Sequence, residues 1–215
     1  MKIKKIEIMD TTLRDGEQTS GMSFSEYEKL TISKLLLKEL KVDRIEVASA
    51  RVSSGEFNAV SKIMDWAKSE KLDDKVEILT FVDNGVSIDW IKKTGAKVQN
   101  LLAKGSFNHL KYQLKKTPKQ HFKDVEHTIQ NAQKNNITTN IYLEDWSNGM
   151  KDSKKYVFDF LNFLKNQPIK RVLLPDTLGV LNPLRTSQYL RRVISDYPDI
   201  HFDFHAHNDY DLSVA

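Results

Sequence analysis

The chain has 215 residues, 40% of them hydrophobic and 29% charged, which is enough to bury a core and argues against disorder. Its 33 basic and 29 acidic residues give a net charge of +4 and are interspersed, so we expect no nucleic-acid partner; the absence of cysteine excludes disulfides and thiolate metal sites. No apolar run is long enough for a membrane helix or a signal peptide, which predicts a cytoplasmic protein without membrane contact.

Short apolar runs alternate along the chain with longer segments of helical periodicity. Strands are predicted at residues 3–10, 43–49, 75–82, 97–103, 137–144, 169–175 and 200–206. Helices are predicted between them at 25–40, 56–70, 87–94, 118–135, 153–165 and 183–196. Gly95, Gly149 and Gly179 are expected at joins between elements.

This alternation predicts a parallel sheet, either doubly wound or closed as a barrel. No glycine-rich phosphate-binding fingerprint follows the first strand, which argues against a dinucleotide-binding sheet. Polar residues instead recur where strands are expected to end: Arg14, Asp15, Glu46, Glu144, Asp176, Thr177, His205 and His207. The carboxyl ends of all strands meet at one face of a barrel, so we predict an α/β protein with the TIM (β/α)8 fold.

The predicted barrel has seven strands, whereas the complete fold has eight and runs to about 250 residues. We therefore expect residues 1–215 to be one catalytic TIM-barrel domain truncated after strand seven, without strand eight and any C-terminal regions. Residues 211–215 are expected to lie in the helix that follows strand seven. This fragment alone is expected to be inactive or nearly so.

His205 and His207 are separated by one residue on a predicted strand, so their side chains point to the same face and can hold one ion together. Asp15, expected at the end of the first strand, supplies a carboxylate to the same ion. Two imidazoles and one carboxylate leave coordination positions open for substrate, and they accept Zn²⁺, Mn²⁺ or Mg²⁺. The alternative is that the histidines are ordinary polar residues.

Three further residues are candidates for chemistry. Arg14 offers fixed positive charge to an oxygen that becomes anionic, or forms a salt bridge to Glu46, and both can hold at once. Glu144 is a candidate general base, or it orders Arg14. Thr177 offers a hydroxyl to a substrate carboxylate, although Thr-Leu-Gly is also typical of a turn.

Leu79, Leu102 and Tyr142 lie near the ends of the third, fourth and fifth predicted strands, where they form an apolar wall or belong to the core. The remaining histidines, His109, His121, His127 and His201, are expected to lie apart from the candidate site. His121 and His127 fall in the predicted helix 118–135, and both are expected on its surface.

Three segments together resemble a known family. Residues 10–18 (DTTLRDGEQ), 174–179 (LPDTLG) and 204–209 (FHAHND) are similar, in this order, to motifs of the metal-dependent TIM-barrel family that contains 2-isopropylmalate, homocitrate and citramalate synthases. Residues 47–52, 100–105 and 142–149 resemble the bacterial (R)-citramalate synthases most.

The resemblance implies a Claisen-type condensation of acetyl-CoA with a 2-oxo acid, followed by hydrolysis of the thioester, in a protein that is a homodimer when full-length. It assigns the divalent metal to Asp15, His205 and His207. It also implies that Arg14 stabilises the oxyanion, Glu144 assists proton transfer and Thr177 holds the substrate carboxylate. Leu79, Leu102 and Tyr142 match positions that line the pocket for the oxo-acid side chain.

These pocket residues leave room for a methyl group, which favours pyruvate as the 2-oxo acid and (R)-citramalate as the product. The nearest alternative is 2-isopropylmalate synthase, which acts on 2-oxoisovalerate. Homocitrate synthase is disfavoured because the pocket residues carry no charge. A lyase that cleaves hydroxymethylglutaryl-CoA, and a barrel that binds without catalysis, are the remaining alternatives.

Overall fold

The structure, a computed structural model, describes residues 6–215, and the chain divides into two compact units. Within the described residues, unit 1 consists of residues 6–100 and 135–137, and unit 2 of residues 101–134 and 138–215. Strand β4 (Val98–Lys104) begins in unit 1 and ends in unit 2. Strands β1 to β7 follow one another in the sheet in chain order.

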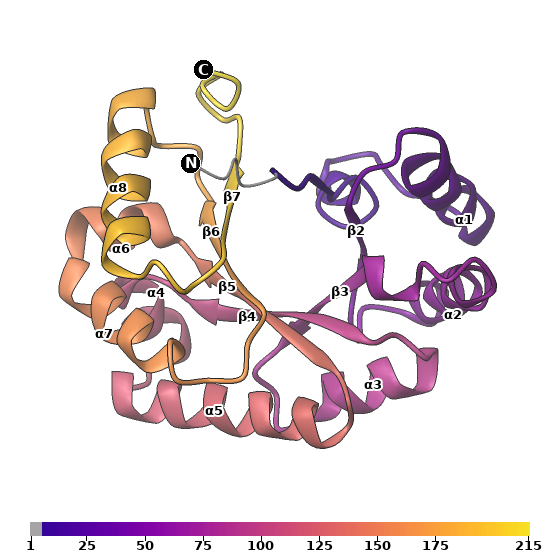
Figure 1. The fold of residues 1–215 in the computed structure, drawn as a ribbon, viewed down its shortest axis with the longest axis horizontal. Coiled ribbons are helices and arrows are strands. Elements are labelled where there is room, and N and C mark those ends of the chain that lie inside the picture. The colour runs from indigo at the N-terminus through magenta and orange to yellow at the C-terminus, as the bar shows by residue number, and fades with distance from the viewer. Residues whose placement is uncertain (1–5) are drawn as a thin grey trace. The chain divides into compact units, whose positions relative to one another are not determined.

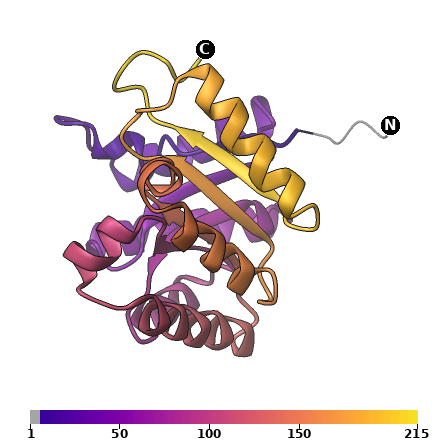
Figure 2. The same ribbon diagram turned by 90° about the vertical axis from the view of Figure 1, so that its left-hand side faces the viewer.

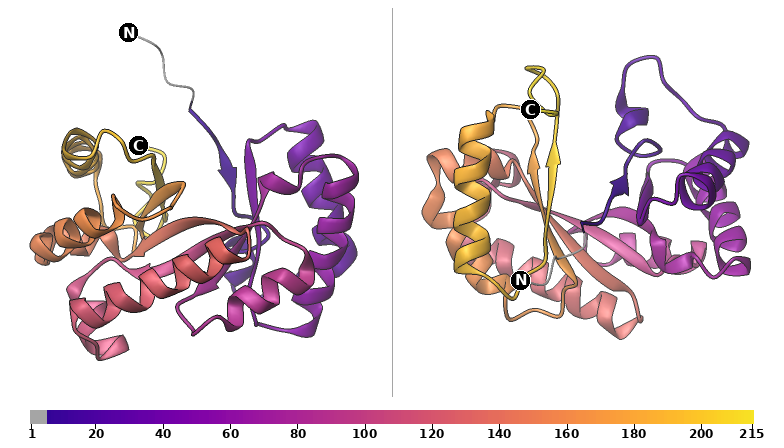
Figure 3. Two further views of the ribbon diagram at one scale, coloured as in Figure 1. Left: turned by 60° about the horizontal axis from the view of Figure 1, so that its bottom comes forward. Right: turned by 45° about the horizontal axis from the view of Figure 1, so that its top comes forward.

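Unit 1 contains strands β1 (Met9–Asp10), β2 (Arg44–Ser49) and β3 (Val76–Phe81). The β1–β2 and β2–β3 pairs are parallel, with Met9 opposite Arg44 and Ile45 opposite Val76. Helices α1 (Glu26–Lys34) and α2 (Ser54–Ser69) connect these strands, and α3 (Val86–Thr94) follows β3; the three helices lie on one side of the strands (Figures 1 and 3). Both faces of β2 and β3 are buried, including the charged side chains of Arg44, Glu46 and Glu77.

Unit 2 contains strands β5 (Thr138–Glu144), β6 (Arg171–Asp176) and β7 (Phe202–Ala206), which are also paired in parallel. Its helices are α4 (Phe107–His109), α5 (Pro118–Lys134), α6 (Trp146–Asp152), α7 (Lys154–Leu164) and α8 (Pro183–Asp196). Figure 2 shows α8 running alongside β7. Asn182 caps α8 by accepting the Arg185 N–H at 2.9 Å, and Pro183 occupies the first helical turn.

The predicted strands and long helices are all present, and the seven-stranded α/β architecture is that of a TIM barrel. The first strand is shorter than expected, with Met9–Asp10 as its described part; residues 3–5 lie outside the described residues. The expected helix 25–40 changes after α1 into a π-helical turn, Leu35–Glu39. A second π-helical turn, Leu110–Leu114, and the short helices α4 and α6 were not predicted, because one or two turns carry too little periodicity.

The prediction of a helix at residues 211–215 is wrong, because this segment forms turns and bends. The Asn208 side chain accepts hydrogen bonds from the Ser213 N–H at 3.2 Å and the Ser213 hydroxyl at 2.7 Å. It also donates to the Asp211 carboxylate at 3.1 Å. Such side-chain bonds compete with helix formation and hold these residues in a compact turn.

Gly149 lies inside α6, not at a join as expected, and it packs against Gly105, which follows β4. A Cβ atom on Gly149 would collide with the Gly105 carbonyl oxygen. A Cβ atom on Gly105 would collide with the Leu143 carbonyl oxygen and lie 2.9 Å from that of Glu144. The two glycines therefore allow backbone-to-backbone contact between the ends of β4 and β5 and the start of α6.

We expect Gly105→Ala to lower the free energy of unfolding by about 1–3 kcal/mol, because the backbone around Glu144 must move to admit the methyl group. Urea denaturation followed by circular dichroism measures the change. Gly55→Ala in α2 is the matched control, since the nearest atom to its added Cβ is Ser53 Oγ at 3.6 Å. Equal stabilities of the two variants would contradict the expected collision.

Candidate active site

The loop after β1 presents Arg14 and Asp15 from unit 1. The Thr11 carbonyl oxygen accepts the backbone N–H groups of Arg14 at 3.1 Å, Asp15 at 2.8 Å and Gly16 at 3.2 Å, which forms a tight turn. Asp15 therefore lies five residues beyond the end of β1, not at the end of the strand as expected, and it directly precedes the 3₁₀ turn Gly16–Gln18. Its position is fixed by the loop.

Arg14 is held by two carboxylates. Its Nε donates to Glu46 Oε2 at 2.5 Å and its Nη1 donates to Asp15 Oδ1 at 2.7 Å. Glu46 is fully buried in the middle of β2, not at its carboxyl end as expected, and also accepts from Asn100 Nδ2 at 2.6 Å. The predicted salt bridge between Arg14 and Glu46 is confirmed, and it fixes the guanidinium group in one orientation.

A buried lysine also binds the loop after β1. Lys29, on α1, places its Nζ 2.6 Å from Glu17 Oε2 and 2.5 Å from Glu56 Oε1. It also donates to the Leu13 carbonyl oxygen at 3.1 Å. Burial raises the pKa of Glu56, while its bond to Lys29 opposes that rise. A cavity of about 280 Å³ is lined by residues that include Arg14, Glu17 and Glu56.

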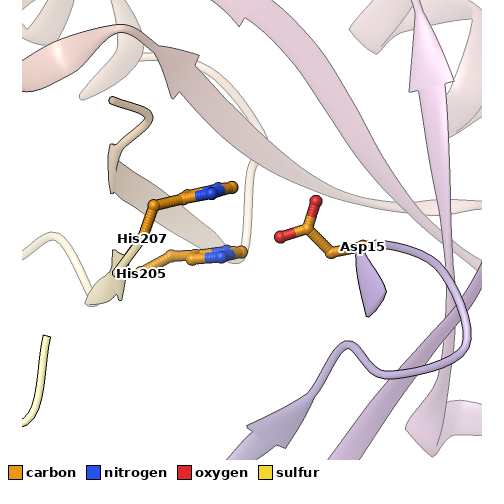
Figure 4. A group of neighbouring side chains, drawn as sticks. All are labelled: Asp15, His205 and His207. Carbon is orange, nitrogen blue, oxygen red and sulfur yellow. The ribbon is translucent and has the colours of Figure 1, made fainter. Parts of the chain in front are cut away.

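His205 and His207 lie at the end of β7 in unit 2, both half-buried. Their rings are parallel, with centroids 4.9 Å apart and an angle of 6° between the ring planes. Figure 4 shows both rings extending from β7 in the same direction, and it also draws Asp15, the candidate ligand from unit 1. The Tyr142 ring meets His205 edge-on at 6.3 Å. The predicted shared orientation of the two histidines is confirmed.

Glu144 ends β5, and its carboxylate contacts a residue that the sequence did not single out. Lys104, the last residue of β4, donates from Nζ to Glu144 Oε2. His109 was expected to lie apart from the candidate residues, and this is wrong: its Nδ1 is 4.0 Å from Glu144 Oε1. Its Nε2 is 3.4 Å from Asp145 Oδ2.

Asp145 adopts a left-handed backbone conformation, with φ of 64°, directly after Glu144. This conformation is uncommon outside glycine, although aspartate tolerates it better than most residues. The buried Asp145 carboxylate accepts from Ser106 Oγ at 2.6 Å and from Asn148 Nδ2 at 2.7 Å. The backbone that follows Glu144 is therefore held by Ser106, which caps α4, and by Asn148 of α6.

Thr177 follows β6, and its Oγ1 accepts the Asp145 backbone N–H at 2.9 Å. Because this bond uses the oxygen as an acceptor, the hydroxyl proton can be donated to a substrate carboxylate. The neighbouring Asp176 carboxylate accepts the backbone N–H groups of Val180 at 3.1 Å and Leu181 at 2.8 Å. Asp176 thus stabilises the turn, while Thr177 is suited to bind a ligand.

The residues of the expected apolar wall belong to both units. Leu79 is buried in β3 of unit 1, whereas Leu102 is half-buried in β4 and Tyr142 is buried in β5 of unit 2. Within unit 2, Tyr142 lies on the same side as His205, which it contacts. Leu102 and Tyr142 therefore remain pocket candidates on unit 2, and Leu79 remains one on unit 1.

His121 was expected on the surface of its helix, and this is wrong. It is 1% exposed on α5, whereas His127 on the same helix is exposed as predicted. The ring packs edge-on against Phe160 at 5.5 Å, and its Nε2 accepts the Lys104 backbone N–H at 3.2 Å. Burial, with a smaller contribution from the positive charge of Lys116, lowers the pKa of His121 to about 4.

The chain matches the HMGL-like family over residues 5–215. It is 32% identical over 213 residues to a 2-isopropylmalate synthase of Sulfurisphaera tokodaii, and the aligned region covers 99% of this chain and 53% of that protein. It is 28% identical over 215 residues to a homocitrate synthase of Sulfolobus acidocaldarius, and the aligned region covers 98% of this chain and 44% of that protein. The chain thus spans about half the length of the curated relatives it matches.

Among solved structures, the chain is similar to the HMG-CoA lyase of Bacillus subtilis, with a TM-score of 0.73 and 20% identity. The likeness covers 96% of this chain and 70% of that one, and it concerns the fold alone. Across residues 6–215, the structure has no helix that is both long and apolar enough to cross a bilayer.

Proposed function

Because the chain belongs to the HMGL-like family, we propose that it is the barrel domain of an enzyme that condenses acetyl-CoA with a 2-oxo acid and then hydrolyses the thioester. The observation that carries this proposal is its sequence identity, over nearly the whole chain, to synthases named for 2-isopropylmalate and homocitrate. In such a reaction the acetyl methyl group loses a proton and its electron pair forms a bond to the ketone carbon. The ketone oxygen then carries the negative charge.

We propose that Asp15, His205 and His207 hold one divalent metal ion. Their carboxylate and imidazole groups are the donors that Zn²⁺ and Mn²⁺ accept, and the parallel rings of the two histidines suit binding of a common ion. The metal, when bound, polarises the ketone of the oxo acid. The choice between these ions and Mg²⁺ depends on availability as well as on the donors.

The protein residues supply the remaining parts of this chemistry. Arg14, fixed by Glu46, offers a positive charge to the oxygen that becomes anionic. Glu144 supplies a carboxylate for proton transfer. Thr177 donates its hydroxyl proton to the carboxylate of the oxo acid, because its oxygen already accepts the Asp145 N–H.

Two oxo acids are the leading substrates. The names of the relatives favour 2-oxoisovalerate and hence 2-isopropylmalate. The identity of Leu79, Leu102 and Tyr142 favours the smaller pyruvate and hence (R)-citramalate, as the sequence resemblance suggested. Discrimination by size alone is worth about 1–3 kcal/mol per methylene, so both acids are expected to react to some degree.

The test is release of free CoA by the gene product that contains this chain, supplied with acetyl-CoA and Mn²⁺ or Zn²⁺. Pyruvate, 2-oxoisovalerate and 2-oxoglutarate are offered in parallel, and the products are identified by mass spectrometry. We expect condensation with one of the first two acids. Release with none of the three, or cleavage of hydroxymethylglutaryl-CoA instead, would contradict the proposal.

A further inference from the structure

Lys104 is the residue at the end of β4 whose ammonium group contacts Glu144. Its side chain is 15% exposed, so the pair is largely shielded from solvent. Lys104 engages Glu144 Oε2. The other oxygen, Oε1, faces His109 Nδ1 at 4.0 Å, beyond hydrogen-bond distance, and Nδ1 is buried without a hydrogen-bond partner among the described residues. The contact therefore leaves Oε1 as the oxygen that can exchange a proton.

The backbone of Lys104 is held on both sides by buried side chains. Its N–H donates to His121 Nε2 of α5 at 3.2 Å, and its carbonyl oxygen accepts from the Tyr156 hydroxyl of α7 at 2.7 Å. Burial lowers the pKa of His121 and raises that of Tyr156. His121 thus remains an acceptor and Tyr156 a donor across the neutral pH range, so both hydrogen bonds persist.

Glu144 is also fixed from its own backbone. The next residue, Asp145, is anchored through its side chain to Ser106 and Asn148, and its N–H is bound by Thr177. Gly105 N–H donates to the Glu144 carbonyl oxygen at 2.6 Å, which links the ends of β4 and β5 directly. The backbone segments that carry Lys104 and Glu144 are therefore linked directly by a hydrogen bond.

We infer that Lys104 is a positioning residue, which binds Glu144 Oε2 and so presents Oε1 to the substrate. The inference rests on the proposed function, in which Glu144 takes part in proton transfer. A flexible glutamate samples several rotamers, and a fixed ammonium partner selects one of them. A purely structural ion pair would contribute to stability but would not act on catalysis through Glu144.

The experiment is a double-mutant cycle in the gene product that contains this chain, using Lys104→Met, Glu144→Gln and the double variant. We expect Lys104→Met to lower kcat about 10- to 100-fold with little change in KM for the oxo acid, because orientation and not binding is lost. In the Glu144→Gln background the same substitution should change kcat by less than about twofold. Recovery of activity by Lys104→Arg would support the positioning role.

Lys155→Met is the control, because Lys155 forms an exposed ion pair with Asp159 on α7 and should leave kcat unchanged. Equal effects of Lys104→Met on kcat in the wild-type and Glu144→Gln backgrounds would overturn the inference.

If the wild-type protein releases no CoA, the proposed function is contradicted but the pairing of Lys104 with Glu144 is not. In that case, labelling of lysine side chains with acetic anhydride, measured by mass spectrometry, tests the pairing of Lys104 with Glu144. We expect Lys104 to be labelled less than the exposed Lys151 in the wild type, and to become reactive in Glu144→Gln. Equal labelling of both lysines in the wild type would overturn the pairing.

Discussion

Replacing His207 by alanine is expected to remove the bound divalent ion and to lower activity by more than about 100-fold. Residues that only support metal ligands already change metal affinity or activity by about 10- to 100-fold, so loss of a ligand should cost more. Metal content per chain, measured by inductively coupled plasma mass spectrometry after purification with Mn²⁺ or Zn²⁺, reports the loss directly. The measured metal content does not depend on enzyme turnover.

His201→Ala is the matched control for this prediction. His201 directly precedes β7, at the end opposite the candidate metal site, and is exposed beside Arg171 and Asp203. Its loss should leave the metal content unchanged. Asp15→Ala tests the proposed carboxylate ligand separately from the histidine pair. Full metal content in Asp15→Ala would show that Asp15 is not a ligand.

The sequence predicted the strands and the orientation of the histidine pair because these follow from local rules. A strand period of two places His205 and His207 on one face in any fold that keeps the strand extended. The salt bridge between Arg14 and Glu46 was one of the alternatives considered for Arg14, and it is present although Glu46 lies in the middle of β2. The position of Asp15 in a loop was not, because the turn on the Thr11 carbonyl leaves no periodic signal.

The contacts around Glu144 were missed for a different reason. His109 reaches Glu144 and Asp145 from the one-turn helix α4, which is too short for any periodicity to reveal. Lys104 was overlooked because a lysine at the end of a strand is usually a solvated residue. Only the joining of β4 to β5 brings it to Glu144, and that pairing is a tertiary feature.

The burial of His121, in contrast, could have been recognised. His121 precedes Val125, Ile129 and Ala132 at intervals of four, eight and eleven residues, and all four are buried on one face of α5. The prediction that His121 lies on the surface gave more weight to the polarity of its imidazole than to this spacing. A histidine on the apolar face of an amphipathic helix should instead be treated as a candidate for burial in the neutral form.

Acidification is expected to destabilise the protein through His121. The pKa of this group is about 4 in the folded chain, lowered by burial, against an ordinary value of 6.5. Between these values the unfolded chain binds a proton that the folded chain does not, so stability falls as pH is lowered from 6.5 to 4. The difference corresponds to about 3 kcal/mol, present in full above pH 6.5 and lost below pH 4.

His121→Gln isolates this contribution, because glutamine can accept the Lys104 N–H and does not titrate. Urea denaturation of variant and wild type at pH 7, 6, 5 and 4 should show the variant less stable at pH 7, since the ring contact with Phe160 is lost. Its deficit should shrink by about 3 kcal/mol towards pH 4. His127→Gln on the exposed face of α5 controls for loss of an imidazole. The carboxylates titrate equally in all three proteins. A constant difference in stability between His121→Gln and wild type would therefore show that His121 is protonated in the folded protein as readily as in the unfolded chain.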